Sequence, residues 1–391
     1  MRDLRAVALL LAGAAVLAMS ACTADPVAPA SPSVAHEGAD AAVSAPDWAR
    51  LDDFPLEPRD GAVTAWTGSE LIVVGGAFHP PCPPTADCVM DGRLARDGAA
   101  YDPASDTWRV LPPPPLTPGL TSGAYADGVL VVPARPDGPT TDVLLYDVSA
   151  DTWSILESPT DRLGMPVADG DRVIFASGSD EWGAVPDRVL DVETRAWSEL
   201  PEDPIGPAFD RTLTATAHGI VLTAKELVPS PGAEKPSFVL AALLDRTTGE
   251  WTRLPDTQQI GGRQWAVHGD RLIDPQLGGA DGGQVGNWGR EYPFGGAVTL
   301  PDGRWSELAN PPPGSGWVQD TAGSRFSVSS GFVYDDEDGT WTPIGQPEDA
   351  LAEAGPAVWA DGQLLVVGGT SWEGITGTRS AAVWSYTPTG R

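Results

Sequence analysis

The chain has 391 residues, and its 54 acidic residues against 24 basic ones give a formal net charge of −30 at pH 7. Such an acidic surface argues against nucleic acid as a partner, because binding there depends on basic side chains that neutralise phosphates, and against electrostatic docking on anionic lipid. Hydrophobic residues make up 41% of the chain, enough for a large core, and there are 15 Trp against 6 Tyr and 8 Phe. That excess of Trp indicates a structural role that is repeated along the chain.

Residues 1–21 have the pattern of an export signal. Two arginines precede an apolar run from Ala6 to Met19, which is too short to span a bilayer as a helix, and small residues follow it. The segment ends in Ala21-Cys22, which resembles the lipobox of bacterial lipoproteins. The resemblance implies that Cys22 is acylated and anchors the protein to the cell membrane on its extracytoplasmic side. An ordinary secretory signal cut near Ala21 is the alternative.

Residues 22–44 comprise this cysteine and a segment rich in Ala, Pro and Ser with no apolar period, which is typical of a flexible tether. The folded domain is expected at 45–391. Two cysteines remain in it, Cys82 and Cys88, in a Pro-rich segment. In an exported protein such a close pair favours a disulfide that pins a loop. Metal binding is the weaker alternative, because only His79 stands nearby and the spacing is not CxxC.

The domain is organised by a Trp followed three residues later by Leu or Ile. This pattern occurs seven times, at Trp48, Trp108, Trp153, Trp197, Trp251, Trp305 and Trp341. Seven residues before five of these Trp stands Tyr or Leu followed by Asp, beginning at Tyr101, Tyr146, Leu190, Leu244 and Tyr334. The aromatic or aliphatic residue ends one strand, Asp makes a turn, and Trp lies in the returning strand.

A turn glycine precedes an apolar strand in every repeat. These glycines are Gly68, Gly128, Gly170, Gly219, Gly269, Gly323 and Gly362. Runs such as Leu71–Val74 and Leu364–Val367 follow them without alternation, as expected of a strand that is buried on both faces. Each repeat therefore holds four antiparallel strands, with the glycine between the first and second and the Asp turn between the third and fourth.

Repeats of four strands, too small to bury their own faces, predict an all-β, seven-bladed β-propeller. The recurring sequence features resemble the kelch repeat. In that repeat a second strand ends in a double glycine, here Gly75-Gly76 or Gly368-Gly369, and Tyr-Asp and then Trp-x-x-Leu follow. The resemblance covers about residues 46–390, although only the first and last repeats keep the double glycine. The last repeat ends after its third strand, near Tyr386. We therefore expect the N-terminal strand around Trp48 to close the last blade.

The spacings show which face of the propeller varies. From each Trp to the next turn glycine there are 17 to 22 residues, whereas from the glycine to the following Trp there are 18 to 40. The variation therefore lies between the second and third strands. Those connections share one face with the connections between blades, and we call it the loop face. Variable loops on a rigid scaffold are where binding is usually found.

Two sets of residues on the loop face are candidate ligand-binding residues. Four arginines precede first strands and would surround one mouth of the central channel: Arg59, Arg162, Arg211 and Arg263. They suit the recognition of carboxylates; the alternative is that they cap backbone carbonyls or pair with an Asp of their own blade. Three of the Trp outside the repeat lie in the variable loops: Trp182, Trp288 and Trp372. They would stack on a sugar or anchor a partner, or else pack within their own loops.

No catalytic or metal-binding motif stands out. Kelch-type propellers include copper radical oxidases resembling galactose oxidase, which need two His, a Tyr and a Tyr–Cys crosslink. Here His36 lies in the tether, His218 and His268 lie at turns on the opposite face, and only His79 lies on the loop face.

The sequence therefore predicts a surface-anchored binding module without a cofactor, monomeric, that uses the loop face. Its partner would be an envelope protein, a glycan or a small acidic ligand. The alternatives are a carbohydrate-active enzyme (epimerase, lyase or hydrolase) on the same face and a structural subunit of an envelope complex.

Overall fold

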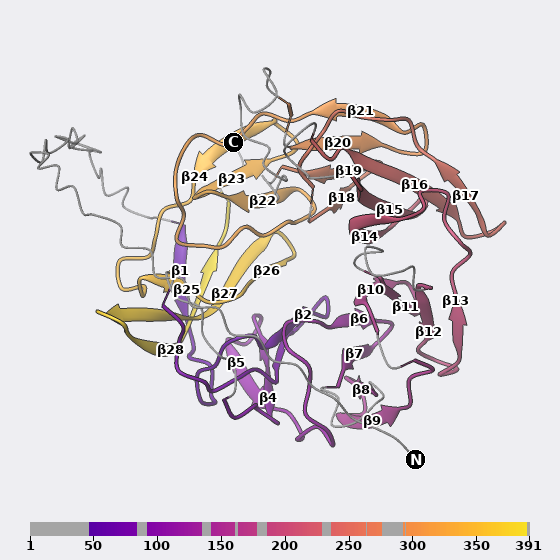
Figure 1. The fold of residues 1–391 in the computed structure, drawn as a ribbon. Helices are drawn as coiled ribbons and strands as arrows, with labels where there is room; N and C mark the ends of the chain where they lie inside the picture. Colours follow the sequence, from indigo (N-terminus) through magenta and orange to yellow (C-terminus); the bar gives the residue numbers. More distant parts are fainter. Residues whose placement is uncertain are drawn as a thin grey trace, which may run out of the picture. The chain divides into compact units, whose positions relative to one another are not determined.

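The computed structural model describes residues 47–83, 92–134, 142–160, 163–177, 186–228, 236–262, 264–275, 292–293 and 295–388. Strands are the regular structure of these ranges, and none of them contains a helix that could cross a membrane. Seven antiparallel sheets stand side by side in a ring, as Figure 1 shows. The predicted all-β, seven-bladed propeller is confirmed.

Blades one to five each have four strands in chain order, running outward from the centre of the ring (Figure 1). Blade one consists of β2 (Val63–Trp66), β3 (Leu71–Val74), β4 (Gly98–Asp102) and β5 (Thr107–Val110). Blade two consists of β6 (Ala124–Ala126), β7 (Val129–Pro133), β8 (Val143–Asp147) and β9 (Thr152–Leu156). Blade three consists of β10 (Met165–Asp169), β11 (Arg172–Ala176), β12 (Arg188–Asp191) and β13 (Trp197–Glu199). Blade four consists of β14 (Ala208–Thr216), β15 (Gly219–Glu226), β16 (Val239–Asp245) and β17 (Glu250–Arg253). Blade five consists of β18 (Ala266–His268), β19 (Arg271–Asp274), β20 (Gly296–Thr299) and β21 (Arg304–Glu307).

The second strand of each blade supplies much of the core. All four residues of β3 are buried, and so are the central residues of β7 and β11. Such a strand has a neighbouring blade on each of its faces, so both sets of its side chains leave water. This explains why the sequence shows unbroken apolar runs where a half-exposed strand would alternate.

Blade seven contains the seam of the ring. It consists of β25 (Glu353–Ala354) and β26 (Ala357–Ala360), which both pair with β27 (Gln363–Glu373), followed by β28 (Thr376–Tyr386) and β1 (Trp48–Leu51). The N-terminal strand β1 pairs antiparallel with β28, with Trp48 opposite Tyr386 and Leu51 opposite Val383. The predicted closure of the last blade by the N-terminal strand is confirmed.

Blade six departs from the repeat. It has the strands β22 (Phe326–Ser329), β23 (Phe332–Asp335) and β24 (Thr340–Pro343), and its innermost strand is reduced to a single bridge between Thr321 and Val328. Six of the seven predicted turn glycines adopt positive φ angles, but Gly323 does not. It lies instead against the Trp359 ring, which an added Cβ would approach to 2.5 Å. With almost no inner strand to pair, blade six needs no tight turn there.

The repeated Trp residues join the blades. Each indole Nε1 donates a hydrogen bond of 2.7–3.1 Å to a backbone carbonyl just after the outer strand of the preceding blade. The pairs are Trp108 with Asp52, Trp153 with Pro112, Trp197 with Glu157, Trp251 with Pro201, Trp305 with Pro255, Trp341 with Ala309, and Trp48 with Ile344. The seventh bond crosses the seam, so the series closes on itself. Only an aromatic ring with an N–H donor combines this bond with packing, which explains the excess of Trp.

The Tyr-Asp or Leu-Asp pair that stands seven residues before most of the repeat Trp residues shapes the turn between the third and fourth strands. At Tyr101, Tyr146, Tyr334 and Tyr386 the phenol ring lies 4.9–5.2 Å, between centroids, from the Trp of the adjacent strand. The turn aspartates accept hydrogen bonds that lower their pKa values. Side-chain bonds from Ser105 and Arg325 are the largest cause for Asp102 and Asp335, and backbone N–H bonds are the largest cause for Asp147, Asp191 and Asp245. Two residues before Trp251 the backbone of Gly249 is left-handed, with φ of +70°.

Candidate functional site

The loop face carries two cavities among the described residues. One, of about 440 Å³, lies between blades one and seven and takes further wall residues from blades two and six. The other, of about 470 Å³, lies between blades three and four. Both are within the size range of small-molecule sites. Arg59 lines the first and Arg211 the second, so the two described members of the predicted arginine set lie at different cavities.

Arg59 precedes β2 and its side chain is only 3% exposed. Its Nη1 forms an ion pair with Asp97 and donates to the Gly75 carbonyl at 3.3 Å, and its Nε donates to the Glu57 carbonyl at 2.9 Å. The guanidinium carbon lies 5.2 Å and 5.0 Å from the ring centroids of Phe54 and Phe78. These contacts match the alternative of capping and pairing within its own blade.

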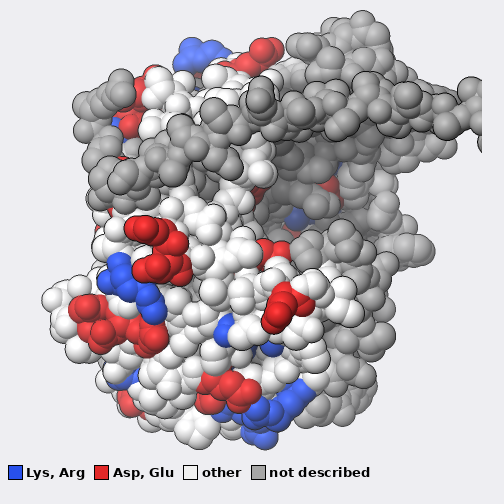
Figure 2. Space-filling model, turned by 90° about the vertical axis from the view of Figure 1, so that its left-hand side faces the viewer, with Lys and Arg blue, Asp and Glu red and all other residues white. Residues whose placement is uncertain are grey.

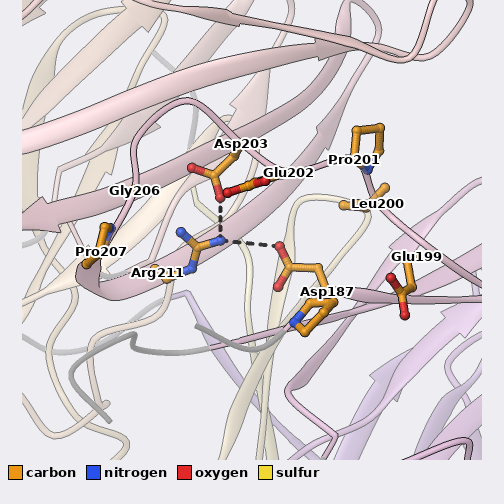
Figure 3. A pocket seen from close by; sticks show the side chains of 10 residues that line it. Asp187, Glu199, Leu200, Pro201, Glu202, Asp203, Gly206, Pro207 and Arg211 are labelled. Atoms are coloured by element: carbon orange, nitrogen blue, oxygen red, sulfur yellow. Dashed lines mark hydrogen bonds and ion pairs between the residues drawn. The ribbon is translucent and has the colours of Figure 1, made fainter. Parts of the chain in front are cut away.

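Arg211 is held in the same manner, but by the neighbouring blade (Figure 3). Its Nη2 lies 3.3 Å from Asp187 and 3.0 Å from Asp203, and its Nε donates to the Ser177 carbonyl at 3.3 Å. Burial raises the pKa of the Asp187 carboxyl, and the nearby Asp203 adds to this, while the Ser177 N–H and Arg211 oppose it. Asp187 of blade three and Asp203 of the connection to blade four therefore compensate the charge of Arg211 within the protein.

The other predicted members of the two sets lie outside the described residues: Arg162, Arg263, Trp182 and Trp288. Arg59 and Arg211 each have carboxylate partners already in the protein. For these two residues, the contacts favour a structural role. Whether they also bind a ligand stays a prediction.

Trp372 lies in a strand, which corrects the expected variable loop. It belongs to β27, and its partner in β28 is Gly377. The connection between β27 and β28 is a long two-stranded extension, because the pairing continues beyond the double glycine Gly368-Gly369 with a register shift. The small and polar residues of this segment are typical of a loop, and the pairing with β28 makes it a strand. The indole Nε1 of Trp372 is buried and has no hydrogen-bond partner within the described part of the chain.

His79 is the residue of this site that sequence analysis had considered only as a metal ligand. It is 4% exposed and lines the cavity between blades one and seven. Its Nδ1 lies 2.9 Å from the Pro80 carbonyl oxygen. Since a carbonyl only accepts, Nδ1 carries the proton of the neutral ring, and Nε2 is left as an acceptor. Nε2 is buried and has no partner among the described residues.

This cavity, which we call the seam cavity, is bounded by two walls. One wall is the face of blade seven that carries Glu353, Thr370 and Trp372. The other is the blade-one segment from His79 to Cys82. The two walls touch, since a Cβ added at Gly377 would come within 2.6 Å of Pro81 and 2.8 Å of the Trp372 ring.

Charges around the seam cavity are mostly paired. Arg59 pairs with Asp97, and Arg379 of β28 pairs with Asp60, another lining residue. The same pattern holds on the side of the ring shown in Figure 2, where basic side chains lie beside several groups of acidic ones. Basic side chains on this side are therefore close to acidic ones, although acidic residues outnumber basic ones in the chain. Glu353 lines the seam cavity and has no ion pair within the described ranges.

Cys82 also lines the seam cavity, but Cys88 lies outside the described residues. The Cys82–Cys88 disulfide therefore stays a prediction, as does acylation of Cys22, which lies outside them too.

The described histidines do not come together as metal ligands. His218 Nε2 lies 2.7 Å from Asp270, and His268 Nδ1 lies 2.7 Å from Asp336, both at turns on the face opposite His79. No group of three or more His, Cys, Asp or Glu side chains suited to a metal ion occurs in the described ranges. These residues do not fit the two-histidine copper set of the oxidases that share the fold, and we derive no chemistry through copper.

Comparison with known proteins supports the fold and goes no further. No protein-family model matches the chain, and neither does a curated protein. Among solved structures, the chain is similar to a fungal alcohol oxidase of the AA5 family in complex with copper, with a TM-score of 0.52 and 14% identity over 87% of this chain and 76% of that one. At that identity the likeness lies in the β-propeller fold, which hosts many unrelated functions.

Proposed function

We propose that this protein is a lipid-anchored binding module on the extracytoplasmic side of the cell membrane, and that the seam cavity is its ligand site. The observation that carries the proposal is a set of three buried nitrogens in residues lining this cavity, His79 Nε2, Trp372 Nε1 and Arg59 Nη2, that lack hydrogen-bond partners among the described residues. Unpaired buried polar groups cost free energy, so native proteins keep few of them without a reason. A ligand that bonds to these nitrogens would remove that cost.

The form of the site favours a small ligand or the end of a glycan over a protein partner. A cavity of about 440 Å³ has the size of a small-molecule site, whereas stable protein–protein interfaces are broad surfaces. The export signal pattern of residues 1–21 and the lipobox resemblance at Cys22 support the location.

The binding proposal is tested by screening a small-molecule library against the full chain in detergent micelles by ligand-observed NMR. We expect binders whose signals are lost with Trp372→Ala and retained with Thr378→Ala, an exposed residue of the same hairpin. Absence of any binder that Trp372→Ala abolishes would refute the seam cavity as the ligand site.

The anchor is tested by Cys22→Ser. The variant should leave the membrane fraction for the soluble fraction, because the acidic chain offers no electrostatic attachment to anionic lipid. Continued sedimentation of the variant with membranes would contradict acylation at this position.

A carbohydrate-active enzyme is the second candidate. Asp60 and Glu353, two carboxylates, line the same cavity, and paired carboxylates serve as acid and base in glycoside chemistry. Asp60 is held by Arg379, which favours a positioning role over proton transfer. Product formation from a panel of glycosides, lost with Glu353→Gln, would favour this candidate over the binding module.

A further inference from the structure

We propose that the seam cavity selects a small organic cation, an amine that also carries hydroxyl groups. This inference rests on the proposed function and adds the ligand class to it. It reverses the charge that the arginines had suggested from the sequence, where a small acidic ligand was expected.

The side chains of one wall are placed by strand pairing. Glu353 of β25 lies directly opposite Thr370 of β27, and cross-strand partners project from the same face of a sheet. Trp372 follows Thr370 by two residues in β27, and residues two apart also share a face. Glu353, Thr370 and Trp372 therefore form a continuous row toward the cavity that all three line.

The opposite wall brings His79 toward this row. Trp372 and Gly377 are partners in the hairpin, and the blade-one residue Pro81 packs against the Gly377 position. The segment with His79 therefore covers the face that carries the row. Its buried Nε2 accepts a hydrogen bond, as argued from the contact of Nδ1 with the Pro80 carbonyl.

The charge balance of the lining favours a cation over an anion. The positive charge of Arg59 is neutralised by Asp97, and the negative charge of Asp60 is neutralised by Arg379. What remains is the carboxylate of Glu353, which has no ion pair among the described residues. The protein as a whole carries −30, so its long-range field also attracts cations.

The ligand that complements these groups has three features. A protonated amine donates to Glu353 and to His79 Nε2, and it gains further from the face of the Trp372 ring through a cation–π interaction. An oxygen acceptor is needed for the N–H of Trp372 and for the buried Nη2 of Arg59. Hydroxyl groups on the same small molecule supply that acceptor and also bond to the Thr370 hydroxyl.

The test compares three probes on one six-carbon chain: 1-amino-1-deoxysorbitol, sorbitol and gluconate, by calorimetric titration of the full chain in neutral buffer. We expect the amine to bind about tenfold more tightly than sorbitol, as for a hydrogen bond to a charged group, and gluconate to bind most weakly. Glu353→Gln should reduce the affinity for the amine to that for sorbitol. Glu373→Gln, an exposed glutamate of the same strand, should leave all three affinities unchanged.

Several results would overturn the inference. Gluconate binding more tightly than the amine, equal affinity for the amine and sorbitol, or an amine preference that survives Glu353→Gln would each do so. If library ligands bind the seam cavity but none of them carries an amine, the ligand class is wrong while the proposed binding function stands. If no library ligand depends on Trp372, the proposed function itself fails.

Discussion

Replacing Trp48 by Ala should weaken the propeller at its seam. The indole donates to the Ile344 carbonyl at 3.1 Å and packs at 5.3 Å from Trp317 and 5.2 Å from Tyr386. Trp to Ala changes in cores cost about 3–5 kcal/mol, and this half-buried ring should lie near the lower end, at about 3 kcal/mol. With an unfolding entropy of about 2.1 cal/mol/K per residue over roughly 340 residues, Tm should fall by about 4 °C.

The matched variant Trp48→Phe keeps the ring contacts and loses only the hydrogen bond. It should cost about 1 kcal/mol, or between 1 and 2 °C in Tm. Calorimetry measures both shifts, and hydrogen exchange measures where the structure opens. Amide protection should fall most in β28, because loosening β1 exposes the edge of that strand.

Trp341→Ala is the control, since Trp341 makes the same kind of bond in blade six, to Ala309 at 2.7 Å, but away from the seam. Its loss of protection should concentrate in β24 and leave β28 unchanged. If β28 in the Trp48→Ala protein exchanges as slowly as in the wild type, the indole does not hold the seam and the reasoning is wrong.

Three further predictions concern the same architecture. Deleting residues 45–56 removes β1 and should cause aggregation or a large fall in Tm, whereas deleting 23–40 should be silent; equal Tm values of the two truncations would refute the role of β1 as the closing strand. The five turn aspartates have pKa values lowered below the unfolded value near 3.9. Their contribution to stability is therefore complete above about pH 4 and is lost as the pH falls through the folded pKa values. A urea midpoint that is the same at pH 3 as at pH 7 would contradict this. Gly249→Ala should destabilise the protein by about 1 kcal/mol, because its φ is +70° and an added Cβ meets nothing within 4 Å, so that only the backbone conformation is strained. Arg195→Gly, at the same turn position of blade three, should cost less, because glycine adopts the positive φ of that position without strain. Thermal melting measures both effects.

The repeat pattern was sufficient to predict the propeller, the number of blades and the closing strand. The reason is that each blade depends on local features that recur at fixed spacings: a turn residue, an apolar run, and a Trp in the outer strand. The missing outer strand at the C-terminus then required one from elsewhere, and the segment with Trp48 was the only unassigned copy. The partner of each Trp, a carbonyl of the preceding blade, became visible only in the structure.

Local patterns did not predict the inner strand of blade six or the extension of blade seven. Gly323 occupies the position of the other turn glycines in its repeat, yet the strand before it is reduced to one bridge, and the glycine packs against the Trp359 ring without a positive φ. The segment around Trp372 carries the small and polar residues of a loop, and pairing with β28 makes it a strand. In both cases a contact with another segment decided the conformation.

Only the tertiary structure brings the residues of the seam cavity together. His79 and Trp372 are far apart in the chain, and they line one cavity because ring closure places blade seven beside blade one. Sequence analysis located the loop face and named Arg59, Arg211 and Trp372, but it assigned a role from residue type. Which charges are neutralised by a neighbour, and which buried nitrogens are left without one, depends on atoms from several blades. The ion pairs of Arg59 and Arg211 weaken the expectation of an anionic ligand, and the unpaired Glu353 is the basis of our proposal of a cation.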